Sequence, residues 1–324
     1  MKAIVYERYG PPDVLQYREI EKPIPADGQV LIQVRASSVN PYDWHFIRGT
    51  PIFIRLFTGI RAPKSQRLGA DVAGIVEAVG CNVVSLKPGD AIFGTATGSF
   101  AEYVCAPESS LALKPERLSW EQAASVPLAG ITALQGLRDK GGLRAGQRVL
   151  INGAAGGVGT FAVQIAKSLG AHVTGVCSTR NVELLRSIGA DDVVDYSRED
   201  FFRAGQLYDL FFDLVGNNPL RGCLGVLHPK GIYIGCGGGG PDRRSIEFLG
   251  SVLHQVALAP FTTQKMPGFL AKMNTADLNF LANLMRAGKI VPVLDRSYAL
   301  QETASAIRYL EQGHARGKVV ITVP

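Results

Sequence analysis

The sequence predicts an α/β protein with two domains, a parallel sheet with crossing helices and a small antiparallel barrel. Residues 1–118 hold short Val- and Ile-rich segments between Pro/Gly turns, without long helices, which is typical of such a barrel. From residue 119 on, strand-like and helix-like segments alternate, which indicates βαβ units and a parallel sheet. The last strand-like segment, Lys318–Val323, does not extend this alternation, so we expect it to return to the barrel.

In the first domain, strands are predicted near residues 30–40, 71–80 and 101–107. A helix is then expected from Ser119, a good capping residue followed by Gln122, through Leu137. The segment around Asn40 and Pro41 is expected to form a turn.

The central part contains the alternating segments. Strands are expected at Arg148–Asn152, His172–Cys177, Asp192–Asp195, Asp209–Leu214 and Gly231–Gly235, and helices at Val158–Leu169 and Asn181–Ile188. The tail adds two amphipathic helices, Ala276–Ala287 and Leu300–Gln312. The predicted domains are therefore residues 1–118, 119–266 and 267–324, with the third returning to the first.

Composition narrows the functional classes. With 46% hydrophobic and 19% charged residues the chain is globular, and its net charge of +6 comes without a basic run interleaved with aromatics, which argues against a nucleic-acid partner. Five cysteines without metal-ligand spacing argue against a disulfide framework, so we expect a reducing cytoplasm. No signal peptide is evident, and the longest apolar stretch, Phe248–Phe261, is interrupted by polar residues, so we expect a buried or subunit-facing helix there and no membrane span.

The segment Gly153–Gly159 carries the strongest functional pattern. It is a GxGxxG-type turn whose first glycine is replaced by Ala154, and it follows a predicted strand and opens a predicted helix. Gly156 and Gly157 leave the backbone open to a pyrophosphate, and Gly159 lets the helix pack closely on its strand. The helix opening at Val158 directs free N–H groups at phosphates, so we expect a dinucleotide.

The end of the next strand favours NADPH over NADH. An NAD site usually places an acidic residue there to accept from the ribose 2′-hydroxyl. In this chain Val176–Asn181 contains no carboxylate, but Ser178 and Arg180 could bind a 2′-phosphate. The alternative is that Arg180 is a solvated residue at a helix start.

A metal site is not expected. The five histidines, His45, His172, His228, His254 and His314, do not pair with a cysteine or another histidine at a short ligand spacing.

The chain resembles the zinc-independent quinone oxidoreductase branch of the medium-chain dehydrogenase/reductase superfamily, which includes zeta-crystallin. The matching blocks include VRASSVNPYDW, LGADVAGIVEAVG, KPGDAIFG, PLAGITALQGL, GAAGGVGT and GADDVVDY. The ending GHARGKVVI is most similar to the subgroup of mitochondrial and chloroplast-envelope quinone oxidoreductase homologues. The resemblance implies a Rossmann domain inserted in a GroES-like barrel. Zinc-binding relatives carry a His-Glu pair where this chain has Ala70-Asp71, which supports a metal-free site.

The resemblance also implies cofactor contacts. Those to the pyrophosphate would come from Ala155, Gly157 and Val158, and Tyr196 would join Ser178 and Arg180 at the 2′-phosphate. The nicotinamide half would meet Val215, Asn217, Gly235 and Cys236, and the tail would contribute His314, Ala315 and Arg316.

The implied reaction is hydride transfer from NADPH to a quinone or to the β-carbon of an activated alkene. Asn40 could stabilise the developing negative charge with its side-chain amide, and His45 could donate a hydrogen bond or the final proton. Tyr42 is a weaker candidate. The alternatives are that Asn40 caps a turn and that His45 is a packed core residue. In many relatives a tyrosine stands in place of His45. The apolar segment Pro51–Lys64 could wall an acceptor site or only pack against the barrel.

Two other functions stay open on the sequence: an NADPH-binding sensor or nucleic-acid-binding protein with little catalysis, and an alcohol or aldehyde dehydrogenase, which the missing zinc ligands disfavour. We expect a homodimer, for example through an edge strand at Gly231–Gly235.

Overall fold

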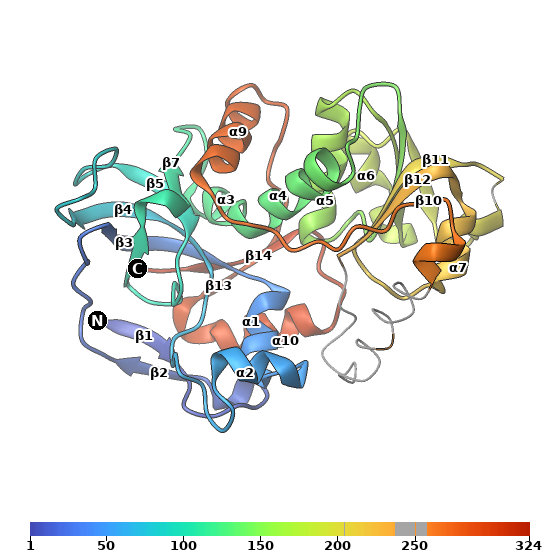
Figure 1. Cartoon of the computed structure of the whole chain (residues 1–324). Helices are drawn as coiled ribbons and strands as arrows, with labels where there is room; N and C mark the ends of the chain where they lie inside the picture. Colours follow the sequence, from blue (N-terminus) through green and yellow to red (C-terminus); the bar gives the residue numbers. More distant parts are fainter. Residues whose placement is uncertain (204, 237–249, 251–257) are drawn as a thin grey trace. The chain divides into compact units, whose positions relative to one another are not determined.

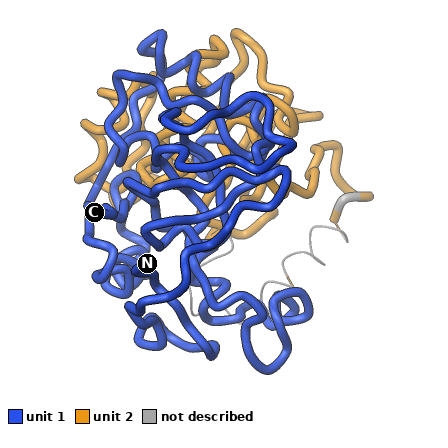
Figure 2. The backbone as a smooth tube through the Cα atoms, turned by 90° about the vertical axis from the view of Figure 1, so that its left-hand side faces the viewer, with its two compact units in different colours: residues 1–131, 272–324 blue, residues 132–271 orange. Residues whose placement is uncertain are grey.

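The computed structural model describes residues 1–203, 205–236, 250 and 258–324. It divides into two compact units, coloured in Figure 2: unit 1 comprises residues 1–131 and 272–324, and unit 2 comprises residues 132–271. The predicted domains differ from these units in where they divide the chain, since residues 119–131 group with unit 1. Most of the helix expected at Phe248–Phe261 lies outside the described residues.

Unit 1 is built on a seven-stranded sheet (Figure 1). Its strands lie in the order β13 (Leu294–Ala299), β14 (Lys318–Thr322), β3 (Gln29–Val39), β4 (Asp71–Val79), β5 (Ala91–Thr95) and β7 (Leu111–Leu113), with β6 (Tyr103–Pro107) also pairing with β3. The expected return of the tail is confirmed, because β14 pairs antiparallel with β3 and places Val319 opposite Val39. A separate hairpin joins β1 (Lys2–Val5) to β2 (Gln16–Glu19).

Unit 1 contains both helices that contact this sheet and helices that pack on other elements. They are α1 (Pro41–Arg48), α2 (Arg55–Thr58), α3 (Trp120–Ala124), α9 (Thr275–Arg286) and α10 (Thr303–Glu311). The unit's core is apolar and draws on both ends of the chain, from Ile32 in β3 to Ile307 in α10 and Ile321 in β14. Burial of such side chains is the main stabilising contribution to a barrel of this size.

Helix α1 corrects the expectation of a turn around Asn40. Pro41 occupies the first helical position, where its missing N–H costs nothing, and Gly49 ends the helix in the left-handed conformation at φ +59°. The Asp43 carboxylate accepts from the Asn40 backbone N–H at 2.8 Å, which closes the first turn. These helix signals were present in the sequence.

The single helix predicted from Ser119 to Leu137 is divided into three helical segments in the structure. Capping by Ser119 is confirmed, since its hydroxyl accepts from the backbone N–H of Gln122 at 3.2 Å. The helix is then interrupted before Pro127, because proline lacks a backbone N–H and restricts the backbone conformation of the residue before it. A second helix, α4 (Pro127–Leu134), follows and continues into a π-helical segment, Gln135–Lys140.

Unit 2 contains the predicted parallel sheet. Its strands lie in the order β10 (Asp192–Asp195), β9 (His172–Cys177), β8 (Arg148–Asn152), β11 (Tyr208–Asp213) and β12 (Leu227–Gly235), all parallel. Helices α5 (Gly157–Ser168), α6 (Val182–Ser187) and α7 (Leu220–Gly225) lie in the connections. The predicted β8, β9 and β10 are confirmed to the residue.

The strand order reverses at the centre of this sheet. The chain runs outward from β8 to β9 and β10, then returns to β11 on the other side of β8. Because parallel crossovers are right-handed, the connections on the two sides cover opposite faces, so the sheet is doubly wound as predicted. Ligands of such sheets bind at the carboxyl ends of the strands where the order reverses, here Asn152 and Asp213.

The edge strand β12 bears on the expected dimer. Its backbone is paired with that of Lys265. The Tyr233 N–H donates to the Lys265 carbonyl at 2.8 Å, and the Lys265 N–H donates to the Gly231 carbonyl at 2.9 Å. A second copy could therefore not pair with β12 along that stretch without displacing Lys265. The homodimer stays a prediction.

Within the described ranges, no helix combines the length and the apolarity that crossing a bilayer requires.

Candidate functional site

The glycine turn of unit 2 leaves no room for side chains where the helix meets the strand. Gly153 has φ +78°, and a Cβ at Gly159 would lie 2.2 Å from the Gly153 carbonyl oxygen and 2.6 Å from Ala154 backbone atoms. At Gly156 a Cβ would meet only that same oxygen, at 3.4 Å. Gly159 is thus required by the fold itself, whereas steric contact within the chain does not require a glycine at position 156.

The start of α5 fits a phosphate group. Gly156 caps the helix without a side-chain hydrogen bond, and the first turn contains no acidic residue. Gly156, Gly157 and Val158 are half-buried, while Ala155 and Gly159 are buried. The first N–H groups of a 12-residue helix therefore stand at a partly open turn beside the sheet's reversal point, where a pyrophosphate would neutralise the helix dipole.

The end of β9 gathers the residues predicted for the 2′-phosphate. Ser178 is half-buried, Arg180 is exposed, and Tyr196, which follows β10, is 60% exposed. The buried Asn181 donates from its amide to the Ser178 hydroxyl at 3.3 Å, and its side-chain oxygen has no partner among the described residues. The orphaned Asn181 oxygen is an acceptor that would need a donor such as a hydroxyl, so it does not itself indicate a phosphate at this position.

A carboxylate does stand next to this strand end, on the neighbouring strand. Asp195 lies opposite Cys177 in the sheet and accepts from the Thr179 hydroxyl at 2.5 Å, and Arg198 lies 3.5 Å away. The Thr179 hydrogen bond lowers the pKa of Asp195, so this carboxylate is ionised near neutral pH. The linear spacing along β9 does not reveal it, because it comes from β10.

A buried carboxylate organises the loop after β11. Asp213 Oδ1 accepts from the Asn152 amide at 2.9 Å and from the backbone N–H groups of Val215 and Gly216 at 3.1 and 2.9 Å. Its Oδ2 accepts from the Tyr233 hydroxyl at 3.0 Å. Sequence reasoning missed Asp213, although an acidic residue that ends a buried strand is a recognisable signal.

The residues predicted at the nicotinamide half lie around Asp213. The side-chain oxygen of Asn217 accepts from the Asn152 amide at 3.3 Å, and Cys236 donates its backbone N–H to the Asp213 carbonyl at 2.8 Å. Burial raises the pKa of the Cys236 thiol to about 12, with a smaller contribution from Asp213, so it stays a neutral thiol. The structure therefore groups Val215, Asn217 and Cys236 at one strand end, with Gly235 adjacent.

His314, Ala315 and Arg316 lie in unit 1, between α10 and β14. His314 Nδ1 contacts the Gln312 carbonyl, and the Arg316 backbone N–H donates to the Asp295 carboxylate at 2.9 Å. His314 and Arg316 are exposed. Their contact with a cofactor stays a prediction.

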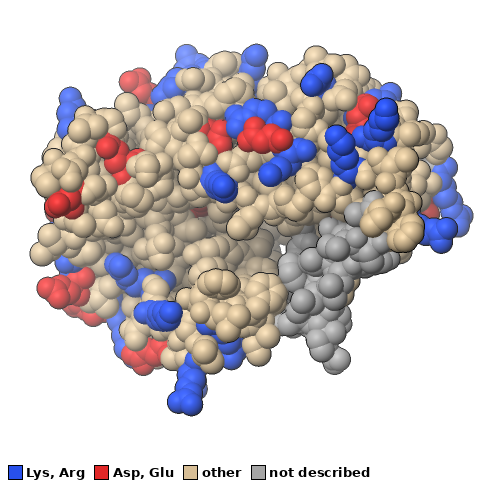
Figure 3. Space-filling model, in the orientation of Figure 1, with Lys and Arg blue, Asp and Glu red and all other residues tan. Residues whose placement is uncertain are grey.

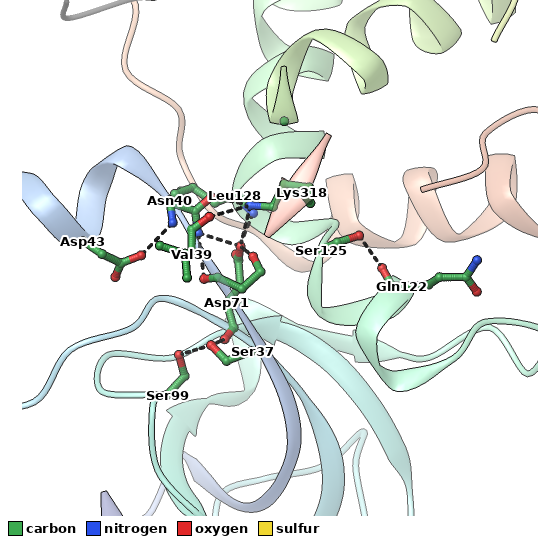
Figure 4. A network of polar contacts seen from close by, with 12 residues as sticks. Ser37, Val39, Asn40, Asp43, Asp71, Ser99, Gln122, Ser125, Leu128 and Lys318 are labelled. Atoms are coloured by element: carbon green, nitrogen blue, oxygen red, sulfur yellow. Dashed lines mark hydrogen bonds and ion pairs between the residues drawn. The ribbon is translucent and has the colours of Figure 1, made fainter. Parts of the chain in front are cut away.

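Unit 1 contains a buried polar network centred on Asp71 (Figure 4). Asp71 is fully buried at the start of β4, and its Oδ2 accepts from the Ser38 hydroxyl at 2.5 Å and from the Asn40 amide at 2.8 Å. Its Oδ1 accepts from the Leu128 backbone N–H at 2.8 Å. Lys318, on β14 and 3% exposed, places its ammonium 3.5 Å from Asp71 Oδ2 and 2.6 Å from the Asn40 side-chain oxygen.

The network bears directly on the predicted role of Asn40. One amide proton goes to Asp71, the other goes to the Ser38 carbonyl at 3.2 Å, and the side-chain oxygen accepts from Lys318. An amide has two protons, so Asn40 could donate to an acceptor molecule only by giving up one of these bonds. In this arrangement Asn40 fixes the start of α1 and links it to β4 and β14.

The predicted proton donor His45 is half-buried in α1. Its Nδ1 contacts the Thr50 carbonyl oxygen at 2.7 Å, which fixes that nitrogen as the N–H donor. Burial lowers the pKa of His45, so the neutral form dominates at neutral pH. Neutral His45 then offers Nε2 as a hydrogen-bond acceptor, and proton donation from it would first require protonation.

Asp43 is the second fully buried carboxyl of the network. Its Oδ1 has no hydrogen-bond partner among the described residues. Burial raises the pKa of Asp43 to about 7, partly offset by the hydrogen bond from Asn40, with the neighbouring Asp71 raising it further. Below that pH Asp43 is protonated and uncharged.

The raised pKa of Asp43 predicts a pH-dependent stability. Between about pH 4 and pH 7 the folded state keeps a proton that the unfolded chain has lost, so stability should fall as the pH rises through this window. The loss is on the order of 4 kcal/mol for about three pKa units. In D43N, urea unfolding at pH 4 to 8 should lack this fall, and D27N, at an exposed position, should keep it. Parallel curves for D43N and the wild type would contradict the prediction.

Unit 1 also contains a pocket of about 270 Å³. Its walls are mainly apolar and aromatic, with Tyr42 stacked on Phe46 at 4.0 Å between ring centres. Phe57 and Lys64, from the apolar segment Pro51–Lys64, are part of the lining. The remaining lining residues are Tyr6, Thr58, Ser65, Arg67, Leu68, Gly69 and Thr97.

Possible metal ligands are not brought together. Among the residues that the structure describes, no three His, Cys, Asp or Glu side chains cluster in a way that could hold a metal ion. Asp71, in the Ala70-Asp71 pair, is instead committed to the polar network.

Comparisons with known proteins agree with this architecture. A family model described as Alcohol dehydrogenase GroES-like domain matches residues 26–116, and one described as Zinc-binding dehydrogenase matches residues 188–321. The 2-methylene-furan-3-one reductase of Solanum lycopersicum is 34% identical, covering 99% of this chain and 79% of that protein. The chloroplast envelope quinone oxidoreductase homolog of Arabidopsis thaliana is 31% identical and covers 99% and 98%.

A solved structure extends the agreement to the whole fold. The quinone oxidoreductase from Coxiella burnetii superposes with a TM-score of 0.85 at 32% identity, covering 100% of this chain and 99% of that one. The predicted GroES-like barrel with an inserted Rossmann domain is therefore confirmed. The chain is an oxidoreductase that belongs to the medium-chain dehydrogenase/reductase superfamily, in its quinone oxidoreductase branch.

Proposed function

We propose that this oxidoreductase uses NADPH, without a metal ion, to reduce quinones or the activated C=C bond of α,β-unsaturated carbonyl compounds. The observation that carries the proposal is the unit 1 pocket, whose aromatic walls and neutral phenols suit a flat conjugated carbonyl compound. Relatives whose names specify a methylene-furanone reductase and a quinone oxidoreductase support both acceptor classes.

Preference for NADPH rests on the end of β9. A 2′-phosphate would find the Ser178 hydroxyl and the Arg180 guanidinium there, and β9 itself offers no carboxylate to the 2′-hydroxyl. Asp195, on the neighbouring strand, already accepts from the Thr179 hydroxyl and from the Ser197 backbone N–H at 3.0 Å, and Arg198 lies beside it, which supports this preference.

The bound cofactor would supply a hydride, two electrons and one proton, to the quinone or to the alkene β-carbon, and would leave as NADP⁺. A second proton, from solvent or an acidic group, completes the hydroquinone or the saturated ketone. The chain's own contribution is to orient the acceptor and to donate hydrogen bonds to its carbonyl oxygen as negative charge develops.

The phenols of the pocket are suited to that donation. Burial raises the pKa of Tyr42 to about 12 and raises the pKa of Tyr6 as well, so both keep their protons at neutral pH. Tyr42 is therefore a better-placed donor than the fully bonded Asn40 amide, which we propose acts by positioning α1. His45 stays a candidate for relaying the final proton.

The test is a single-turnover measurement of NADPH oxidation with 1,4-naphthoquinone and with ethyl vinyl ketone, on protein dialysed against EDTA. We expect acceleration by at least one of them and no loss after dialysis. Tight NADPH binding without turnover on either acceptor would instead favour the sensor or nucleic-acid alternative. On the face that Figure 3 shows, acidic side chains lie among the basic ones, which gives the nucleic-acid alternative little support.

Cofactor preference can be tested by substitution. In R180Q the affinity for NADPH should fall about tenfold, because one charge-assisted hydrogen bond is lost, while NADH affinity stays unchanged. R221Q is the matched control, since Arg221 is an exposed arginine of the same unit on α7. Equal losses for both cofactors in R180Q would show that Arg180 does not bind the 2′-phosphate.

A further inference from the structure

The charges that line the unit 1 pocket are all of one sign. Lys64 and Arg67 are the charged lining residues, and no carboxylate is part of the lining. Among the described residues, no hydrogen bond or ion pair joins either side-chain cation to a carboxylate. Other cations of the chain, such as Lys2, Arg48 and Lys167, do pair with an Asp or Glu side chain. Two cations around a largely apolar space form a site for an anion attached to an apolar group.

The backbone that carries the two cations is fixed. The Lys64 N–H donates to the Thr58 carbonyl at 2.7 Å, which ties Lys64 to the end of α2. Arg67 lies opposite Val5 in an antiparallel bridge, and the Tyr6 N–H donates to the Gln66 carbonyl at 2.9 Å. Arg67 and Tyr6 are thus held on neighbouring strands of chain at the pocket wall.

The aromatic wall is held in place as well. The Tyr9 hydroxyl lies 2.8 Å from the Thr58 hydroxyl and donates to the Gly59 carbonyl at 2.7 Å. Arg55 stacks over the Tyr9 ring and donates to the Gly49 carbonyl at 3.1 Å, which joins α2 to the end of α1. The position of Phe57 and Thr58 relative to Tyr42 and Phe46 is therefore set before any ligand binds.

The acidic group that acts on the two phenols of the pocket is Asp43. It is fully buried and outside the lining, so it does not face the space in which a ligand would lie. Its negative charge contributes to the raised pKa of Tyr6 and of Tyr42. The accessible wall therefore presents two cations, neutral phenols and apolar surface.

We propose that the pocket selects acceptors that combine a small conjugated enone or quinone with a negatively charged substituent, which Arg67 and Lys64 bind. This rests on the proposed function and specifies its substrate class. The pocket volume of about 270 Å³ lies just below the usual range of small-molecule sites, so the acceptor would be of the size of one substituted ring rather than a long lipid chain.

A matched pair of compounds tests the charge alone. They are 4-(3-oxobut-1-enyl)benzoate and its methyl ester, which share the enone and the ring and differ in the carboxylate. Equilibrium binding of each is measured by calorimetry, and reduction of each by NADPH is measured separately. We expect the carboxylate to bind about tenfold or more tightly than the ester, the effect of a charge-assisted hydrogen bond.

Substitutions then assign the preference to the pocket. R67Q should lose the preference for the carboxylate and bind the ester within about twofold of the wild type, and R67K should retain most of it. K64Q should weaken it partially. R61Q removes the same charge from an exposed arginine of the same loop that is not part of the pocket lining, so it should change neither affinity. If R67Q does not fold, K64Q still reports the charge dependence.

The two proposals fail in different ways. Equal binding of the acid and the ester, binding of neither, or the same loss in R61Q as in R67Q would overturn the inference about the substrate's charge, even if both compounds are reduced. Charge-selective, Arg67-dependent binding without reduction would instead overturn the reductase proposal and leave the ligand class standing.

Discussion

Replacing Lys318 by methionine should lower the free energy of unfolding by about 3–5 kcal/mol at pH 7, the usual result of leaving a buried charge without its partner. Lys318 is 3% exposed, and its ammonium group faces Asp71 at 3.5 Å and the Asn40 oxygen at 2.6 Å. Without the ammonium, the Asp71 carboxylate would remain in a fully buried site with only neutral donors. Urea unfolding followed by circular dichroism measures the change.

Two further variants make this prediction specific. K289M removes a lysine from an exposed position of the same unit and should change the free energy by less than about 0.5 kcal/mol. The double variant D71N/K318M removes both buried charges and should be more stable than K318M alone, because no unpaired charge remains. If D71N and K318M were additive, Lys318 and Asp71 would not act as a pair.

The G159A substitution should destabilise unit 2 by on the order of 3 kcal/mol and abolish dinucleotide binding. The added Cβ would lie 2.2 Å from the Gly153 carbonyl oxygen and 2.6 Å from the Ala154 carbonyl. Backbone atoms cannot rotate away as a side chain can, so the start of α5 would have to move off β8. That movement would open the turn that the pyrophosphate is predicted to occupy. Thermal unfolding and NADPH fluorescence titration measure the two effects.

G156A separates folding from ligand binding at the same turn. A Cβ there would meet only the Gly153 oxygen at 3.4 Å, so stability should stay within about 1 kcal/mol of the wild type. If the pyrophosphate passes over Gly156, NADPH affinity should still fall by about tenfold or more. G225A, where an added Cβ meets nothing within 4 Å, is the control in the same unit and should change neither property. Unchanged NADPH affinity in G156A would place the phosphates elsewhere.

Local patterns predicted the parts of the fold that depend on local hydrogen bonding. The bounds of β8, β9 and β10 match the expectation because each contains β-branched residues and is bounded by turn residues. The Ser119 cap was also predictable, since its partner Gln122 lies three residues away. The helix expected through Leu137 was wrong because apolar periodicity was given more weight than the backbone restriction at Pro127.

Local patterns did not reveal what the polar side chains of unit 1 do. Asn40 was assigned to catalysis from its residue type, yet its amide is bonded to Asp71, 31 positions away, and to Lys318, 278 positions away. No spacing rule connects these residues. Pairing of β3 with both β4 and β14 brings them together.

The sequence by itself therefore determined the fold class, the superfamily and the glycine turn, because strand periods, turn glycines and helix caps act over a few residues. Only the tertiary structure decided which polar groups are available for chemistry. It committed the Asn40 amide, surrounded Asp195 with donors, and brought Tyr6, Tyr42 and Arg67 to one pocket. The physical reason is that the availability of a polar group depends on its nearest neighbours in space, and strand register and loop packing choose those neighbours.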